Sequence, residues 1–287
     1  MLFRSTAMPG SARTELEVPV EAEARVEPEL MEHDYWRITE EDDLEALVEE
    51  IETWRKQAQL AGETPVLAFY VEATDPHPLR GEPLSLNLCW QNGRARQLLL
   101  PTDQELTGIK NRLSTQIKAW LEDAELLKVL HDAKSVWVIM HRAGYTIQGM
   151  VGDTLLEAYL TNPALAKLSL EDLSLQYLNQ LILPAPDPVW EGCRRAEAVL
   201  RLHLYLREQL QKAELTSLYR EVELPLVQVL ARMEKTGVYL DAAALEKMSE
   251  ELGERLEELR REIYILAGEE FNINSPKQLG VILFEKL

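Results

Sequence analysis

The sequence predicts an α/β fold: a mixed sheet with flanking helices, followed by an α-helical segment. Residues 65–71 are an unbroken apolar run, which is typical of a strand buried on both faces. Residues 84–90 alternate between apolar and polar side chains, and the Asn-Gly pair behind them is a hairpin turn signal that leads to a third strand at 96–100. Over 241–267, apolar residues recur every three or four positions, which indicates a long amphipathic helix.

The other elements of the sheet domain follow from the same kinds of pattern. Ahead of the first strand, the acidic residues 40–43 complement the dipole of a helix whose apolar stripe runs from Leu44 to Trp54. Behind the third strand, the pattern predicts helices at 103–122, 135–143, 154–161, 170–179 and 190–213, with a short strand at 127–130. Three antiparallel strands, then helices alternating with a parallel strand, fit a ribonuclease-H-like mixed sheet.

A second, helical part of the chain begins after Leu215. Two helices, over 222–233 and 241–267, are predicted there, with a short strand at 238–240 between them. Ser275 is a good N-cap for another helix, which reaches the last residue about three turns later. Because little chain remains to cover the apolar face of that helix, we expect the sequence to be a piece of a larger protein.

Composition narrows the environment in which this chain works. A net charge of −19 argues against a broadly basic nucleic-acid surface, although it does not exclude a local one. Cys89 and Cys193 lie far apart without a partner motif, which fits buried thiols in a reduced, cytoplasmic compartment. We find no apolar run long enough for a signal peptide or a membrane span, so no membrane partner is expected. Residues 1–33 have no clear period and are predicted to be a linker or disordered arm.

Several stretches carry a resemblance to a known family. Residues 218–226 (LYREVELPL), 233–238 (MEKTGV) and 269–279 (EEFNINSPKQL) closely resemble the start of the polymerase domain in bacterial family A DNA polymerases. Residues 152–163 (GDTLLEAYLTNP) resemble the matching part of the 3′–5′ exonuclease-like domain of that family. The resemblance covers roughly residues 34–287.

The resemblance implies a domain organisation and a biological setting. Residues 34–213 would be the exonuclease-like domain, and residues 214–287 would be the first palm helix and the thumb helices of a truncated polymerase domain. The intact enzyme would be a DNA-directed DNA polymerase, a nucleotidyltransferase of replication and repair that uses Mg²⁺ and binds primer–template DNA. This chain would need no cofactor and would pack against the remainder of the polymerase domain. No palm carboxylate motif occurs in it, so we expect no polymerisation by this chain alone.

The same resemblance identifies the positions of the exonuclease chemistry. Proofreading members of the family hold two metal ions among carboxylates, which come from an Asp-x-Glu, a second Asp and a Tyr-x3-Asp. The corresponding positions here are Tyr70, Glu72, Val136, Cys193 and Glu197. Only two of the four acids remain. We therefore predict that the site binds no metal and that the domain is a catalytically inactive scaffold.

Two alternatives stay open at this point. An active 3′–5′ exonuclease could recruit Asp75, Asp132 or Asp153 into a rearranged metal site, although none of them has the motif spacing. A non-enzymatic module could bind DNA or a partner through the vestigial domain. His131, beside one aspartate, is interpreted as a local hydrogen-bond partner rather than as a catalytic base.

The helix junction near the C-terminal end is the candidate DNA-binding region. In the family, thumb residues grip duplex DNA through its phosphates and minor groove, and such contacts position DNA without reading its sequence. The matching side chains supply amide, hydroxyl and ammonium donors; they are Asn272, Asn274, Ser275, Lys277 and Gln278. The N-terminus of the following helix also presents backbone N–H groups. A role limited to starting that helix is compatible with the same residues.

Overall fold

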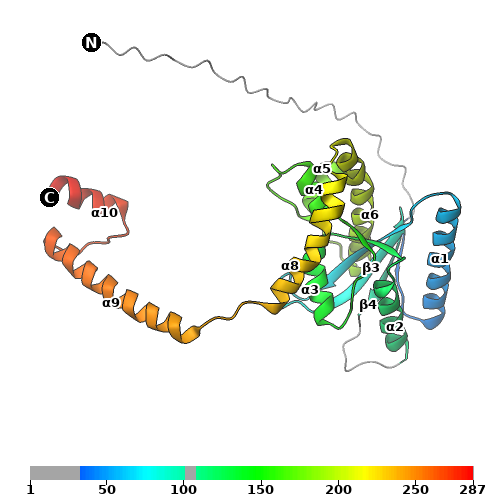
Figure 1. Cartoon of the computed structure of the whole chain (residues 1–287), viewed down its shortest axis with the longest axis horizontal. Helices are drawn as coiled ribbons and strands as arrows, with labels where there is room; N and C mark the ends of the chain where they lie inside the picture. Colours follow the sequence, from blue (N-terminus) through cyan, green and yellow to red (C-terminus); the bar gives the residue numbers. More distant parts are fainter. Residues whose placement is uncertain (1–32, 101–107, 287) are drawn as a thin grey trace, which may run out of the picture. The chain divides into compact units, whose positions relative to one another are not determined.

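A six-stranded sheet lies at the centre of the first compact unit in the computed structural model, which describes residues 33–100 and 108–286 (Figure 1). Its strands are β1 (Asp34–Arg37), β2 (Val66–Ala73), β3 (Pro83–Gln91), β4 (Arg94–Leu99), β5 (Leu127–Leu130) and β6 (Met150–Asp153). They stand in the order β1-β4-β3-β2-β5-β6. β2, β3 and β4 pair antiparallel, whereas β1, β5 and β6 join by parallel pairings. The predicted mixed sheet is confirmed.

Helices cover both faces of this sheet. They are α1 (Glu41–Leu60), α2 (Ile109–Glu122), α3 (Ala133–Arg142), α4 (Thr154–Thr161), α5 (Leu170–Leu178) and α6 (Pro188–Lys212). In β2, Leu67 and Phe69 pack into one core cluster with α1, α2 and α3. Val66 and Ala68 pack into the other cluster with α5 and α6. The unbroken apolar run of β2 thus supplies both cores, as expected for a strand covered on both sides.

Two strands in the sheet were not predicted, because neither has a recognisable apolar pattern. β1 is a four-residue edge strand with charged ends, and it is defined by its parallel pairing with β4 rather than by its own sequence. β6 is equally short and contains Gly152. A Cβ atom added there would lie 2.6 Å from Nδ1 of His203, so this glycine lets α6 approach the strand directly.

The first compact unit continues beyond α6 and ends at Arg232. It includes α7 (Thr216–Leu218), the π-helical turn η2 (Tyr219–Glu223) and most of α8 (Leu224–Thr236). Val227 and Ala231 of α8 are buried in the same core cluster as α1–α3. The start of the predicted helical part therefore packs on the sheet domain, and the family-based border between residues 213 and 214 stays a prediction.

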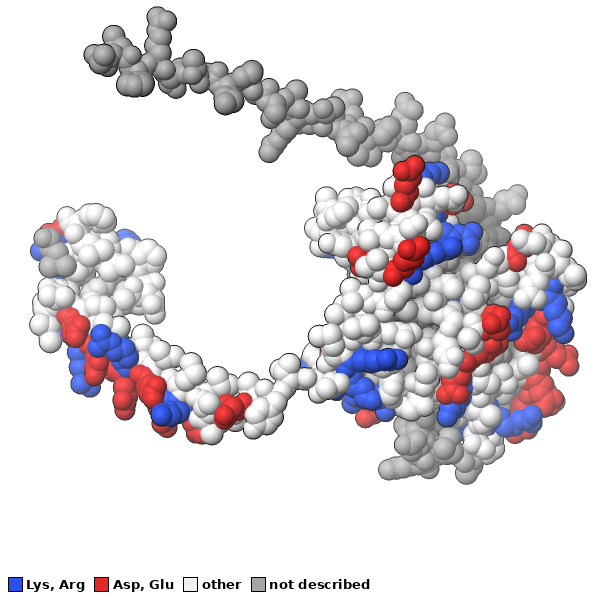
Figure 2. All heavy atoms as spheres, viewed as in Figure 1, with Lys and Arg blue, Asp and Glu red and all other residues white. Residues whose placement is uncertain are grey.

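The second compact unit, from Met233 to Leu287, is helical. It contains α9 (Ala242–Ala267), α10 (Pro276–Val281) and a π-helical turn, η3 (Ile282–Lys286). Asp241 caps α9, and Gly268 ends it with a positive φ of 72°. Lysine, arginine and glutamate side chains alternate along the solvated face of α9, where Lys247 pairs with Glu251 (Figure 2).

The structure corrects one expected element and leaves two others outside its described part. The strand predicted at 238–240 is wrong: Val238 and Tyr239 are more than nine-tenths exposed, and no described strand pairs with them. A strand needs a hydrogen-bonded neighbour, which an isolated apolar triplet does not supply. The predicted arm at 1–33, except His33, and the start of the helix predicted at 103–122 lie outside the described residues. Within the described ranges, no helix is long and apolar enough to cross a membrane.

We predict that the second unit exchanges its amide hydrogens much faster than the sheet. The apolar stripe of α9 is 38–66% exposed at Leu245, Met248, Leu252, Leu256 and Leu259, and no residue of α9 is buried. Each leucine-sized side chain left in water forgoes roughly 1.5–3 kcal/mol of burial free energy. Hydrogen exchange followed by mass spectrometry should show fast exchange over 242–286 and strong protection in β2, β3 and β4. Equal protection of both regions in a monomeric sample would contradict this account.

Candidate functional site

The structure brings four of the five exonuclease motif positions to the same face of the sheet, and only Val136 lies elsewhere. Tyr70 and Glu72 are two residues apart on β2, so their side chains leave the same face. Tyr70 packs against the core cluster to which Cys193 of α6 belongs, and Glu72 is close enough to Cys193 to influence its ionisation. Val136 of α3 packs instead against the cluster on the opposite face. Because Val136 lies on the other face, the five motif positions do not share one side of the sheet where a metal ion could contact all of them.

Neutral donors from β3 and β4 bind one oxygen of the Glu72 carboxylate. The hydroxyl of Ser85, its register partner on β3, donates a hydrogen bond to Oε2 of Glu72. Nε2 of Gln97 on β4 donates to the same oxygen over 3.2 Å. One oxygen of this carboxylate thus accepts two hydrogen bonds from neutral groups of the same sheet.

A row of buried polar side chains crosses the sheet beside Glu72. Nδ2 of Asn87 donates to the carbonyl oxygen of Tyr70 (3.3 Å), and Nε2 of Gln97 donates to Oδ1 of Asn87 (3.1 Å). Nε of Arg37 donates to Oε1 of Gln97 (2.8 Å). α6 lies directly on this row, because a Cβ added to Gly192 would lie 2.2 Å from Oδ1 of Asn87. Side chains and helix backbone occupy the space beneath the helix.

Burial also decides the chemistry of Tyr70 and Cys193. Desolvation raises the pKa of the Cys193 thiol to about 12, so the thiol stays protonated at neutral pH. Because the thiolate is the form that binds metals and attacks electrophiles, the protonated thiol is poorly suited to either role. Desolvation likewise raises the pKa of the Tyr70 hydroxyl, and the guanidinium of Arg195 lies 5.5 Å from the centre of its ring. Both residues behave as packed core side chains.

Glu197, one helical turn after Cys193 on α6, contacts the edge strand β1. Its side chain is almost fully buried, and the hydroxyl of Tyr35 donates to its Oε2. Nδ1 of His33 lies 3.5 Å from the same oxygen. The rings of His33, Tyr35 and Trp190 pack against one another at centroid distances of 4.9–5.2 Å. Burial raises the pKa of Glu197 above its ordinary range.

The acids that a rearranged site would need have other tasks in the structure. Oδ1 of Asp75 accepts the His77 N–H at 2.7 Å in the loop after β2. Asp132, at a positive φ of 50°, caps α3 by accepting from the backbone N–H of Ser135. Asp153 is buried and accepts backbone N–H groups at 2.9–3.1 Å, and desolvation raises its pKa to about 7. Each of these three carboxylates therefore has a hydrogen-bonding role within the protein that needs no metal ion.

The site as a whole does not fit a pair of divalent cations. Such ions need several carboxylate oxygens at one place. Here Glu72 and Glu197 share no hydrogen-bond partner, and within the described residues no three His, Cys, Asp or Glu side chains are grouped so that they could hold a metal ion. Nδ1 of His131 lies 2.8 Å from the hydroxyl oxygen of Thr154, and burial lowers the pKa of His131 to about 4.

The candidate DNA-binding residues lie together at the start of α10. Oδ1 of Asn272 accepts the N–H of Asn274 (3.0 Å), and Oε1 of Gln278 accepts the N–H of Asn272 (2.8 Å). Ser275 caps the helix by accepting the N–H of Gln278 (3.4 Å). The side chain of Lys277 is exposed. Polar side chains thus shape this turn, while the ammonium group remains accessible.

Two family models match the chain. "DNA polymerase I, ribonuclease H-like domain" matches residues 69–184, and "DNA polymerase family A" matches residues 242–287. The chain is 38% identical over 189 residues to DNA polymerase I of Bacillus subtilis, a match that covers 61% of this chain and 22% of that protein. It is 30% identical over 262 residues to DNA polymerase I of Pseudomonas aeruginosa, covering 82% and 28%. The chain therefore spans less than a third of these relatives.

Two solved structures are similar to this chain. The POL domain of Pol1 from M. smegmatis, in complex with DNA primer-template and dNTP, superimposes with a TM-score of 0.72 and 28% identity, covering 88% of this chain and 41% of that chain. NrnC from Brucella melitensis has a TM-score of 0.50 and 15% identity, covering 62% and 90%, and this likeness concerns the fold alone.

We predict that Glu197→Gln does not destabilise the chain at neutral pH. Because burial raises the folded-state pKa of Glu197, ionisation of this carboxyl favours the unfolded chain, and the penalty fades as the pH falls towards the unfolded pKa of about 4.3. Glutamine removes the charge and keeps an oxygen for Tyr35. Urea denaturation at pH 7.5 should show stability equal to or higher than that of the parent, and any gain should shrink as the pH falls towards the unfolded pKa. A clear loss at pH 7.5 would mean that the ionised carboxylate stabilises the fold.

Proposed function

We propose, since this chain belongs to the bacterial family A DNA polymerases, that its exonuclease-like domain is a non-catalytic scaffold in an enzyme of DNA replication and repair. One observation carries the proposal: the two acids that remain from the exonuclease motifs, Glu72 and Glu197, are bound by different partners. Tyr70, Val136 and Cys193 complete the motif positions with side chains that do not bind hard cations. Restoring a two-metal site would need acids at positions that now belong to the packed core.

The second part of the proposal concerns residues 214–287, the start of the polymerase domain. The turn at the start of α10 would touch the phosphates of duplex DNA in the intact enzyme, with Lys277 as the cationic group. The M. smegmatis relative was solved with primer-template DNA, which supports primer–template DNA as the partner. The intact polymerase would use Mg²⁺ in the cytoplasm, whereas this chain alone would neither bind that metal nor polymerise nucleotides.

A nuclease assay tests the scaffold proposal. The purified chain, incubated with 3′-labelled single-stranded DNA and either Mg²⁺ or Mn²⁺, should release no mononucleotide above a metal-free control, because no site gathers the oxygens of two cations. Glu72→Ala separates intrinsic activity from a contaminating nuclease. Release that the parent shows and Glu72→Ala abolishes would overturn the proposal.

The salt dependence of DNA binding tests the second part. Lys277→Ala should weaken binding of primer–template DNA and reduce the slope of log K against log salt by roughly 0.9, the value for one lost phosphate contact on duplex DNA. Fluorescence anisotropy between 20 and about 150 mM salt suits this measurement, because electrostatic contacts weaken across that range.

Lys247→Ala is the matched control for this measurement. It removes another exposed lysine, from α9 of the same unit, so it changes the net charge by the same amount. An identical effect of both substitutions would show that overall charge, rather than the turn at α10, governs binding.

A further inference from the structure

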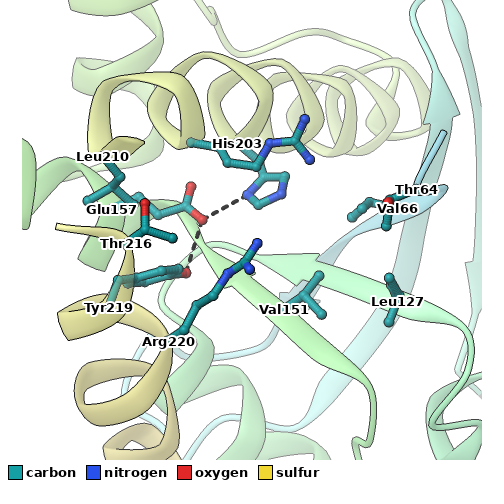
Figure 3. Close-up of a pocket in the computed structure, with 11 residues that line it drawn as sticks. Thr64, Val66, Leu127, Val151, Glu157, His203, Leu210, Thr216, Tyr219 and Arg220 are labelled. Atoms are coloured by element: carbon teal, nitrogen blue, oxygen red, sulfur yellow. Dashed lines mark hydrogen bonds and ion pairs between the residues drawn. The ribbon is translucent and has the colours of Figure 1, made fainter. Parts of the chain in front are cut away.

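A buried polar group joins three helical segments of the first compact unit. The Tyr219 hydroxyl of η2 donates a hydrogen bond to Oε1 of Glu157 on α4 over 3.0 Å, and Nδ1 of His203 on α6 lies 2.8 Å from the same oxygen (Figure 3). These side chains contact one another and stabilise the packing of their own unit. In the second compact unit, by contrast, α9 presents an uncovered apolar face to solvent.

This apolar face of α9 is a candidate interaction surface. Five side chains form it, and they are between 38 and 66% exposed: Leu245, Met248, Leu252, Leu256 and Leu259. In Figure 2 the charged side chains of α9 line one side of the helix and leave the other side uncharged. Because an amphipathic helix gains most of its stability by packing its apolar side, this face is suited to a second helix.

The spacing of the five residues is symmetric about Leu252. Met248 and Leu256 lie four residues before and after it (252 − 248 = 4; 256 − 252 = 4). Leu245 and Leu259 lie seven residues before and after it (252 − 245 = 7; 259 − 252 = 7). With 3.6 residues per turn, steps of four and seven return a side chain to within about 40° of its starting direction. The stripe therefore reads the same in both directions along the helix.

A helix with a symmetric stripe is complementary to an antiparallel copy of itself. We propose that this chain forms a homodimer in which two copies of α9 pack antiparallel across a two-fold axis at Leu252. Met248 of each copy packs against Leu256 of the other copy. Each Leu245 likewise packs against a Leu259. The contact spans 14 residue steps (259 − 245 = 14), or about 21 Å of helix, so it belongs to the small interfaces and the dimer is a weak one.

The charged residues beside the stripe fit an antiparallel copy. Glu251 and Arg255 lie on the same flank of the stripe, one residue before and three residues after Leu252. In the single helix they pair with Lys247 (3.8 Å) and Glu258 (2.8 Å), and these contacts are exposed. An antiparallel two-fold sets each flank beside its own counterpart with the chain direction reversed. Glu251 of each copy then lies next to Arg255 of the other, so opposite charges meet.

The other flank of the stripe permits close approach and disfavours a parallel pair. It carries Ser249 and Gly253, and a Cβ added at Gly253 would have nothing within 4 Å. Small residues allow two helix axes to come close together. A parallel copy would set this flank beside Glu251 and Arg255, and the pairing of opposite charges would be lost.

Sedimentation equilibrium of the 287-residue chain tests the proposal. The mass should rise from that of one chain towards that of two as the concentration increases through the micromolar range. Leu252→Glu sets two carboxylates at the axis and should raise the dissociation constant at least about tenfold. Leu60→Glu adds the same charge at an exposed leucine of α1 and should change nothing.

Two outcomes of this measurement would overturn the proposal. A chain that stays monomeric up to about 0.1 mM, well above a micromolar dissociation constant, would leave the face to the remainder of a longer polymerase. A Leu252→Glu variant that dimerises as tightly as the parent would place the interface on another surface.

Oxidative cross-linking tests the antiparallel register. Cys89 and Cys193 are buried, so a cysteine introduced on the exposed face of α9 is the reactive thiol. With oxidised glutathione, Leu252→Cys should form a disulfide-linked dimer, because its two copies meet at the axis. Leu245→Cys should not, because its two copies lie about 21 Å apart and a disulfide joins Cα atoms separated by roughly 4.4–6.8 Å. Failure of Leu252→Cys to cross-link, or equally efficient cross-linking of Leu245→Cys, would contradict this arrangement.

Discussion

The close packing of α6 on the sheet is the constraint on which the rest of the exonuclease-like domain depends. Gly192 has no side chain, and its backbone lies against the buried amide of Asn87. At this separation the helix places Cys193 in the dry core and turns Glu197 towards β1. A two-metal site needs the opposite, an open space between helix and strand where oxygens and water can surround cations.

The two acids at the motif positions both have hydrogen-bond partners within the protein. Glu72 accepts hydrogen bonds from Ser85 and Gln97, which are neutral groups of the same sheet. Glu197 accepts from Tyr35 and lies beside His33, so it holds an edge strand in place. Glu197 is buried, where a carboxyl group without a partner would be costly, whereas Glu72 is half-buried.

Sequence reasoning identified most of the fold, because hydrophobic periodicity reports on burial. The bounds of β5 and α4 agree with the predicted ranges, and the long helix α9 begins one residue after its predicted cap. β1 and β6 were not predicted, because a four-residue strand is defined by its partner strand rather than by its own hydrophobic pattern. The isolated triplet at 238–240 resembled a strand for the same reason, because periodicity cannot show whether a neighbour exists.

The candidate site was harder to predict from the sequence than the fold. The motif spacing located Tyr70, Glu72 and Cys193, but it could not show that Glu197 turns towards β1, because that depends on tertiary contacts with Tyr35. The buried group of Glu157, His203 and Tyr219 was missed entirely. Its members come from three helical segments far apart in the chain, and no local pattern connects them.

Anomalous diffraction from crystals soaked in Mn²⁺ tests the central claim most directly. The account predicts no manganese peak within coordination distance of Glu72 or Glu197, because protein donors already bind one oxygen of Glu72 and the Tyr35 hydroxyl of β1 binds Glu197. Two neighbouring manganese ions that share Glu72 as a ligand would contradict it and would assign an intact metal site to this domain.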